Sequence, residues 1–236
     1  MGFLEKLQKF DTPTVCNVIE LFGVRPQTIG YMDKRIRALY PELPPMVGYA
    51  STALFRAAEP PAEKGAYATL DEHVKRFADL PGPAVVVFQD LDDPSVAATF
   101  GEVMTTLYKS FGAAGLITSG AGRDLEQVRP LKFPCFSDGL IASHGYPQIF
   151  GLHEPVRVGG LSILPGDLIH GDANGVTNIP HEIASEVADA CAEYCQGEDA
   201  VLSYCRAGGV TAEGVAAARK EMGERMRKLR ERLGRR

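Results

Sequence analysis

The chain has 236 residues, with 25 basic and 30 acidic side chains and a formal net charge of −5. Hydrophobic residues make up 45% of it and charged residues 23%, an ordinary globular composition that excludes a disordered chain and a disulfide-rich miniprotein. No stretch approaches the roughly 18 apolar residues of a membrane span, and charges stand where a secretory signal would have its apolar centre. We therefore expect a cytoplasmic protein without a membrane anchor.

The charge distribution and the cysteine count bear on nucleic-acid binding, disulfides and zinc sites. Residues 219–236 hold nine basic and three acidic side chains, so the rest of the chain is strongly acidic. An acidic body disfavours non-specific nucleic-acid binding. The five cysteines are odd in number and include no Cys-x-x-Cys pair, which indicates neither a disulfide framework nor a structural zinc site.

The first elements follow from caps, prolines and apolar periodicity. Thr12 or Thr14 as cap, with Pro13 in the first turn, predicts a helix through Phe22 that Gly23 ends. The Pro- and Gly-rich residues 24–45 read as a connection. A strand over Val47–Phe55 and a helix over Ala62–Leu80 are expected next.

Beyond Pro81 the pattern is that of a parallel sheet. The run Ala84–Phe88 is apolar and β-branched, as in a strand buried on both faces. Ser95 can cap a helix that reaches Phe111, and a second apolar strand covers Ala113–Gly120. A turn and a short helix through Val128 follow. Strand, helix and strand at this spacing form a βαβ unit.

The last third changes character. Short segments from 133 to 180, with Gly or Pro every few residues, predict antiparallel or mixed strands. Helices follow, with a break near Gly197 and a resumption over Asp199–Arg206. We divide the chain into an α/β domain, 1–208, and a basic C-terminal helix, 209–236.

The C-terminal helix has a seam of apolar residues. Val215, Met222 and Leu229 recur every seven residues, with Met226 and Leu233 between them. A seam of this kind serves either assembly with another subunit or packing against the helix's own domain.

The candidate functional residues lie at the carboxyl ends of the predicted strands, where α/β proteins bind ligands. Glu102 follows one strand, and Gly120–Asp124 follow the next. Arg123 offers a planar fork for a carboxylate and Asp124 a hard oxygen ligand. The alternatives are a surface turn with an exposed ion pair, and a solvated helix carboxylate at Glu102.

Three motifs together resemble the RraA-like family, which includes 4-hydroxy-4-methyl-2-oxoglutarate and 4-carboxy-4-hydroxy-2-oxoadipate aldolases. They are the Gly-Glu helix start at 101–102, the Gly-x-x-Arg-Asp turn ending at Asp124, and the Pro-Gly-Asp…Asp-x-x-Gly-Val…Pro segment from Pro165 to Pro180. The likeness is strongest from about Val85 to Pro180.

The resemblance implies a three-layer β/β/α swivelling-domain fold, assembled as a trimer or hexamer with active sites between subunits. It also implies a bound Mg²⁺ or Mn²⁺ and a small-molecule 2-oxo acid substrate. The roles carried over place Arg123 on the substrate carboxylate, Asp124 on the metal, Glu102 on metal-bound waters, Glu198 as the carboxylate from the neighbouring subunit, and Gly101 and the backbone amides of Val103 and Met104 on the pyruvyl group.

Two function classes follow from the resemblance. One is a metal-dependent class II aldolase that cleaves a 4-hydroxy-2-oxo acid to pyruvate, with possible oxaloacetate decarboxylation. The other is a non-catalytic regulator that binds an RNA-degrading endonuclease. The chain reads Cys16-Asn17-Val18 where the family usually has Asp-Ala-Leu, and residues 137–153 do not match, so the part of the substrate beyond the pyruvyl group is not identified.

Overall fold

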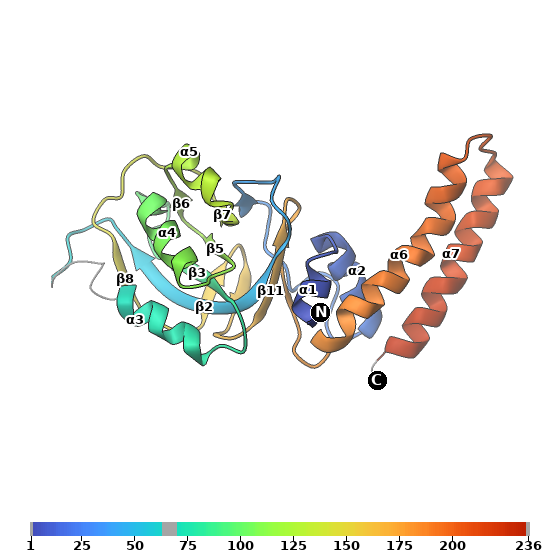
Figure 1. Cartoon of the computed structure of the whole chain (residues 1–236), viewed down its shortest axis with the longest axis horizontal. Helices are drawn as coiled ribbons and strands as arrows, with labels where there is room; N and C mark the ends of the chain where they lie inside the picture. The colour runs from blue at the N-terminus through green and yellow to red at the C-terminus, as the bar shows by residue number, and fades with distance from the viewer. Residues whose placement is uncertain (1, 63–69, 235–236) are drawn as a thin grey trace. The chain divides into compact units, whose positions relative to one another are not determined.

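The computed structural model describes residues 2–62 and 70–234 (Figure 1). Within it the chain forms two compact units, one of residues 30–179 and one of residues 1–29 together with 180–236. These boundaries differ from the division at 208/209 expected from the sequence, because the C-terminal helix belongs to the same unit as the helix before it.

The unit of residues 30–179 is built on a mixed sheet. Strands β2, β3, β5 and β7 are mutually parallel, and β11 and β12 continue the sheet beyond β2 in antiparallel register. The order is β1-β7-β5-β3-β2-β11-β12, with β8 also paired to β2. The strand bounds are β1 (Arg37–Ala38), β2 (Met46–Arg56), β3 (Ala84–Asp90), β4 (Ala98–Phe100), β5 (Gly115–Thr118), β6 (Ala121–Gly122), β7 (Cys135–Ser137), β8 (Gln148–Phe150), β9 (Val156–Val158), β10 (Leu161–Ile163), β11 (Leu168–Asp172) and β12 (Gly175–Ile179).

Helices cover one face of this sheet and a β-hairpin covers the other. The helical elements of the unit are α3 (Leu70–Lys75), η2 (Arg76–Asp79), α4 (Glu102–Ser110), α5 (Leu125–Val128) and η3 (Arg129–Leu131). Strands β9 and β10 form the hairpin on the opposite face. The result is the expected arrangement of three layers, β/β/α.

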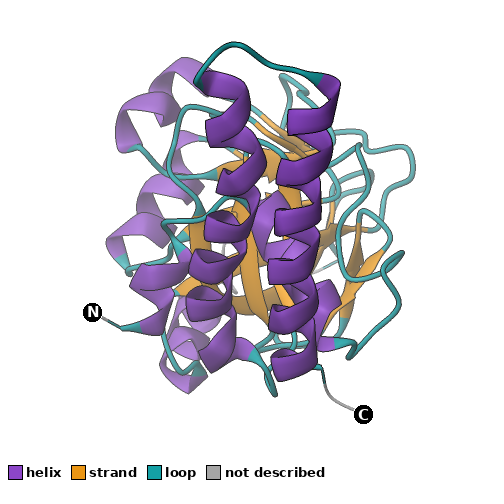
Figure 2. Cartoon of the chain, turned by 90° about the vertical axis from the view of Figure 1, so that its right-hand side faces the viewer, coloured by secondary structure: helices purple, strands orange, loops and turns teal. Residues whose placement is uncertain are grey.

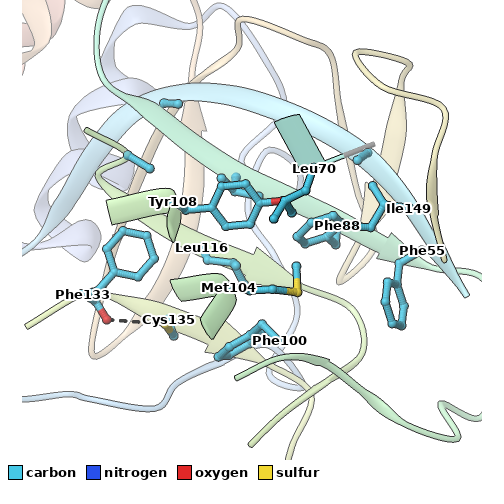
Figure 3. Packing of buried hydrophobic residues seen from close by; sticks show 14 of the residues in the cluster. Phe55, Leu70, Phe88, Phe100, Met104, Tyr108, Leu116, Phe133, Cys135 and Ile149 are labelled. Carbon is cyan, nitrogen blue, oxygen red and sulfur yellow. Dashed lines mark hydrogen bonds between the residues drawn. The ribbon is translucent and has the colours of Figure 1, made fainter. Parts of the chain in front are cut away.

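Side chains on the central strands point alternately to the two faces of the sheet and form a hydrophobic core on each face. On β3, Val86 and Phe88 face the helices, while Val85 and Val87 face the hairpin, and all four are fully buried. This period of two is what a strand with both faces covered requires. Figure 3 shows the helix-side core, where Tyr108 and Met104 of α4 pack over Leu116 and Phe88 of the sheet.

The predicted βαβ unit is confirmed. Strands β3 and β5 pair in parallel, with Val85 opposite Gly115, and α4 connects them. The strand expected over Val47–Phe55 is also present as β2. The part of the helix expected over Ala62–Leu80 that is described is helical as α3 and η2, and residues 63–69 lie outside the described residues.

The helix expected to start at Ser95 is wrong at its beginning. Residues Ala98–Phe100 are instead the buried strand β4, parallel to β6, and α4 starts only at Glu102. Pairing with β6 and a hydrogen bond of 2.9 Å between Thr99 Oγ1 and Thr118 Oγ1 stabilise the extended form. A β-branched residue such as Thr99 also favours a strand.

The other unit is helical. It contains α1 (Phe3–Leu7), α2 (Thr12–Phe22), α6 (Ala184–Arg206) and α7 (Ala212–Leu233), and α6 and α7 run side by side (Figures 1 and 2). Helix α2 is capped by Asp11, whose Oδ1 accepts from Thr14 N at 2.8 Å, and not by a threonine. Gly23 ends it in the left-handed region, as expected.

Helix α6 is continuous, so the predicted break at Gly197 is wrong. A glycine costs a helix interior about 1 kcal/mol relative to alanine. Gly197 is buried against α7, and a Cβ there would lie 2.7 Å from Met226 Cε, so the missing side chain makes room for the neighbouring helix. Packing of the two helices outweighs the low helix propensity of glycine.

The apolar seam of α7 faces its own chain. Leu229 and Leu233 are buried, and Met226 reaches Gly197 of α6. Arg232 also pairs with Glu193 at 2.6 Å. The structure therefore favours packing against the chain's own helices over a seam free for assembly.

Among the described residues, no helix is both long and apolar enough to span a bilayer.

Candidate active site

The first half of the candidate site is the turn from β4 into α4. Gly101 is the N-cap residue of α4 and has an extended backbone with φ −153°. Its need for glycine comes from close approach, because a Cβ there would overlap Asp124 Oδ2 and press on Arg123. The sequence Gly-Glu at this point thus lets the second turn lie directly against the helix start.

The second half is the turn after β6, which places Asp124 at that helix start. Asp124 has φ 59° and ψ 42°, a left-handed conformation that Asp tolerates better than most residues. Its Oδ2 accepts from the amide of Glu102 at 3.0 Å. The carboxylate therefore meets the positive end of α4, where an anion is stabilised. Its Oδ1 has no hydrogen-bond partner among the described residues.

Arg123 lies beside this carboxylate, but the carboxylate does not take up all of its hydrogen-bond donors. The Nε–Oδ2 distance to Asp124 is 3.8 Å, and the two side chains are 31% and 35% exposed. Arg123 Nη1 also donates a long bond of 3.5 Å to Ala142 O. Most of the guanidinium fork is therefore left for a ligand.

The amides of Val103 and Met104 complete the arrangement. They lie in the first turn of α4, where N–H groups have no acceptor within the helix. Glu102 presents an exposed carboxylate at the same end. A guanidinium with only two weak contacts, two amides without an acceptor in the helix and the Oδ1 of Asp124 therefore lie close together, which suits a small anion together with a hard cation.

Val103, Met104, Arg123 and Asp124 line a small pocket of about 50 Å³, whereas Glu102 is not among its lining residues. Five of its lining residues were expected from the sequence, namely Gly101, Val103, Met104, Arg123 and Asp124. His144 also lines it, and sequence reasoning missed this residue, because it belongs to the unmatched segment 137–153. Only the path of that loop brings it here, and no spacing in the sequence signals it. The remaining lining residues are Ala98, Thr99, Phe100 and Pro147.

Glu198 is not part of this pocket. It lies on α6, in the helical unit, and is half-buried. Burial raises the pKa of Tyr194, and the neighbouring Glu198 carboxylate raises it further. Glu198 thus sits beside an uncharged phenol. The other expected residues, by contrast, are brought together within residues 30–179.

A larger cleft of about 470 Å³ lies elsewhere in the same unit. Arg35, Asp90, Asp138 and Arg157 are among its lining residues. Gly120 and Ala121, at the start of the candidate segment Gly120–Asp124, also line it, but Arg123 and Asp124 do not. Burial raises the pKa of Asp90, and its Oδ2 is buried without a hydrogen-bond partner among the described residues. We take the smaller pocket as the candidate site, because of these two pockets, among the described residues, it is the one where a guanidinium and a carboxylate meet a helix N-terminus.

The sequence matches the RraA-like family, described as Aldolase/RraA, over residues 12–177. A protein of Halalkalibacterium halodurans named "Putative 4-hydroxy-4-methyl-2-oxoglutarate aldolase" is 39% identical over 101 residues, 42% of this chain and 47% of that protein. The chain thus spans about half the length of this relative.

Solved structures share the fold. An uncharacterized protein from Pseudomonas syringae superimposes with a TM-score of 0.71 at 22% identity, covering 92% of both chains. Streptomyces coelicolor RraAS2, described as an unusual member of the RNase ES inhibitor RraA protein family, gives a TM-score of 0.65 at 26% identity, covering 84% of this chain and 93% of that one.

Proposed function

The chain belongs to the RraA-like family, and we propose that it is a divalent-metal-dependent class II aldolase that cleaves a 4-hydroxy-2-oxo acid to pyruvate. Oxaloacetate decarboxylation is proposed as a second activity of the same site. The observation that carries this proposal is the convergence of Arg123, Asp124 and the first turn of α4 on one pocket. The name of the Halalkalibacterium relative supports it.

Arg123 and the helix start would hold the pyruvyl end of the substrate. A guanidinium binds a carboxylate through two parallel hydrogen bonds, and Arg123 is the cation that lines the pocket. The amides of Val103 and Met104 would donate to the remaining carboxylate or ketone oxygen. Both sets of donors lie in turns that the Asp124–Glu102 hydrogen bond holds against one another, so the substrate would be oriented before reaction.

The donor set fits a small hard cation. Mg²⁺ is commonly held by one or two carboxylates and several waters, and the open Oδ1 of Asp124 offers such a ligand. The exposed Glu102 carboxylate would accept from metal-bound waters, and Glu198 of a neighbouring subunit would complete the set in a trimer or hexamer. When bound, Mg²⁺ or Mn²⁺ would act as a Lewis acid toward the negative charge that develops on the pyruvyl oxygen.

A screen for pyruvate release tests this function. The chain is incubated with Mg²⁺ or Mn²⁺ and a set of 4-hydroxy-2-oxo acids and oxaloacetate, and pyruvate is measured by a coupled lactate dehydrogenase assay. We expect release above the rate of the metal alone with at least one 4-hydroxy-2-oxo acid. Release no faster than that blank with every compound would refute the proposal.

The second candidate is a protein-binding regulator of an RNA-degrading endonuclease. The likeness to Streptomyces RraAS2 favours it, since that protein is described within an RNase ES inhibitor family. Such a role would not depend on the guanidinium of Arg123. An endonuclease activity assay with the parent and Arg123→Lys separates the two functions: equal inhibition by both, without pyruvate release, would identify a regulator.

A further inference from the structure

We propose that His144 is the proton-transferring residue of this site, taking the proton of the substrate's C4 hydroxyl on Nε2 and returning it to C3. The inference rests on the proposed function and deepens it. His144 lines the pocket that also contains Arg123 and Asp124, yet it takes no part in holding the pyruvyl group as described above. It lines the pocket from the loop after β7, a different element from those that would hold the pyruvyl group.

The loop that carries His144 is firmly attached on both sides. Backbone bonds tie it to β6, to β4 and to the end of β2, so the imidazole is presented by a fixed backbone. These bonds are Gly122 N to Gly139 O (3.0 Å), Ile141 N to Gly122 O (3.1 Å), Ala98 N to Ser143 O (2.7 Å) and Tyr146 N to Ala57 O (2.9 Å).

The residue after His144 reinforces this placement. Gly145 has φ +52°, a conformation that glycine adopts without strain, and a Cβ there would press against Ala57 O. The same glycine supplies the acceptor for the imidazole: His144 Nδ1 lies 2.8 Å from Gly145 O. The local backbone therefore sets both the position of the ring and one of its hydrogen bonds.

That bond decides which nitrogen can act as a base. A carbonyl oxygen only accepts, so Nδ1 must carry the hydrogen that is donated to Gly145 O. In the neutral ring the lone pair is then on Nε2. The backbone carbonyl thus plays the part that an orienting carboxylate plays beside many catalytic histidines.

The other polar side chains that line the pocket cannot act as the base, because each has another interaction or lacks a lone pair. The guanidinium of Arg123 stays protonated and cannot accept a proton. Asp124 Oδ2 accepts from Glu102 N, and its Oδ1 is the proposed metal ligand. The hydroxyl of Thr99 is bonded to Thr118. Among the described lining residues, His144 is the group with a basic lone pair to spare.

The proposed step balances without an added reactant. Nε2 takes the C4 hydroxyl proton, the oxygen's electron pair forms the new C=O bond, and the C3–C4 bond breaks. The electrons of that bond form a C2=C3 double bond while the C2 carbonyl pair moves onto its oxygen, which gives the enolate of pyruvate. The imidazolium then returns its proton to C3, which yields the methyl group of pyruvate and the neutral ring.

Comparing two reactions of one site tests the role. Aldol cleavage needs removal of a hydroxyl proton, whereas oxaloacetate loses carbon dioxide without it. We expect His144→Gln to lower aldol cleavage on the order of 100-fold and decarboxylation far less. It should also slow the exchange of pyruvate methyl protons in D₂O, followed by ¹H NMR. Addition of imidazole to His144→Ala should restore part of the cleavage rate.

The matched control is His181→Gln, since His181 is an exposed histidine of the helical unit. It should cleave and decarboxylate like the parent. Equal losses of both reactions in His144→Gln would assign the residue a structural role and overturn the inference, as would an unchanged cleavage rate. A parent chain that releases no pyruvate would instead overturn the proposed function, so the two failures are distinguishable.

Discussion

Lowering the pH from 7.5 to 5.0 should destabilise the fold of residues 30–179 through one buried histidine. His73 is fully buried in the helix-side core, where its ring meets Phe77, Phe88 and Tyr108 edge-on. Its Nδ1 lies 3.1 Å from Tyr108 Oη, and its Nε2 lies 3.0 Å from Ser51 Oγ. Burial lowers the pKa of His73 to about 4.

The sign and size of this pH effect follow from the linkage between proton binding and folding. Between its ordinary pKa of about 6.5 and about 4, His73 takes up a proton in the unfolded chain but not in the folded one. Its contribution to the free energy of unfolding is therefore fully present above pH 6.5 and lost as the pH falls toward 4. At pH 5.0 the loss amounts to about 2 kcal/mol. Burial lowers the pKa of His153 as well, which adds a loss of the same sign.

Urea unfolding followed by far-UV circular dichroism at pH 7.5 and 5.0 measures this loss. His73→Gln removes the titration and should show a decrease smaller by about 2 kcal/mol than the parent's. His73→Phe, which keeps a ring in the aromatic cluster, serves if the glutamine variant does not fold. The exposed His181→Gln should decrease like the parent. An equal pH dependence in the parent and both His73 variants would refute the reasoning.

Three further predictions concern the site and the helical unit. Arg123→Lys should lower kcat/KM for pyruvate release on the order of 100-fold, because an ammonium cannot form two parallel bonds to a carboxylate; Arg157→Lys, in the larger cleft, is the control. Gly101→Ala should lower the same activity, since its Cβ would displace the Asp124 carboxylate; unchanged kinetics would show that the close approach is unimportant. In thermal unfolding, Gly223→Ala should stabilise by about 1 kcal/mol, because nothing lies within 4 Å of its added Cβ.

The sheet could be predicted from the sequence because its pattern is local. The run Ala84–Phe88 is apolar at every position, and a strand covered on both faces is the simplest structure that buries it. The turn after the next strand carries Arg123 and Asp124 at a strand end, where ligands bind in α/β proteins. These residues could be singled out before their neighbours in space were known.

The features that could not be predicted from the sequence depend on contacts between residues far apart in the chain. Ala98–Phe100 is a strand because β6, more than 20 residues later, supplies its hydrogen bonds. Gly197 stays helical because Met226 packs over it. His144 joins the site only through the path of its loop across β6 and β4. In each case tertiary contacts outweigh the local preference.

The central claim is that Asp124, at the start of α4, holds a catalytic metal. The most direct measurement follows Mn²⁺ binding by electron paramagnetic resonance and pyruvate release in the same samples, for the parent, Asp124→Asn and Glu126→Gln. Glu126 is a matched control because its side chain is 81% exposed, two residues away.

We predict that the metal-stripped parent releases no pyruvate until Mn²⁺ is added, that Asp124→Asn loses both binding and release, and that Glu126→Gln keeps both. Full release by the stripped parent in excess chelator, or binding and release retained in Asp124→Asn, would contradict the account.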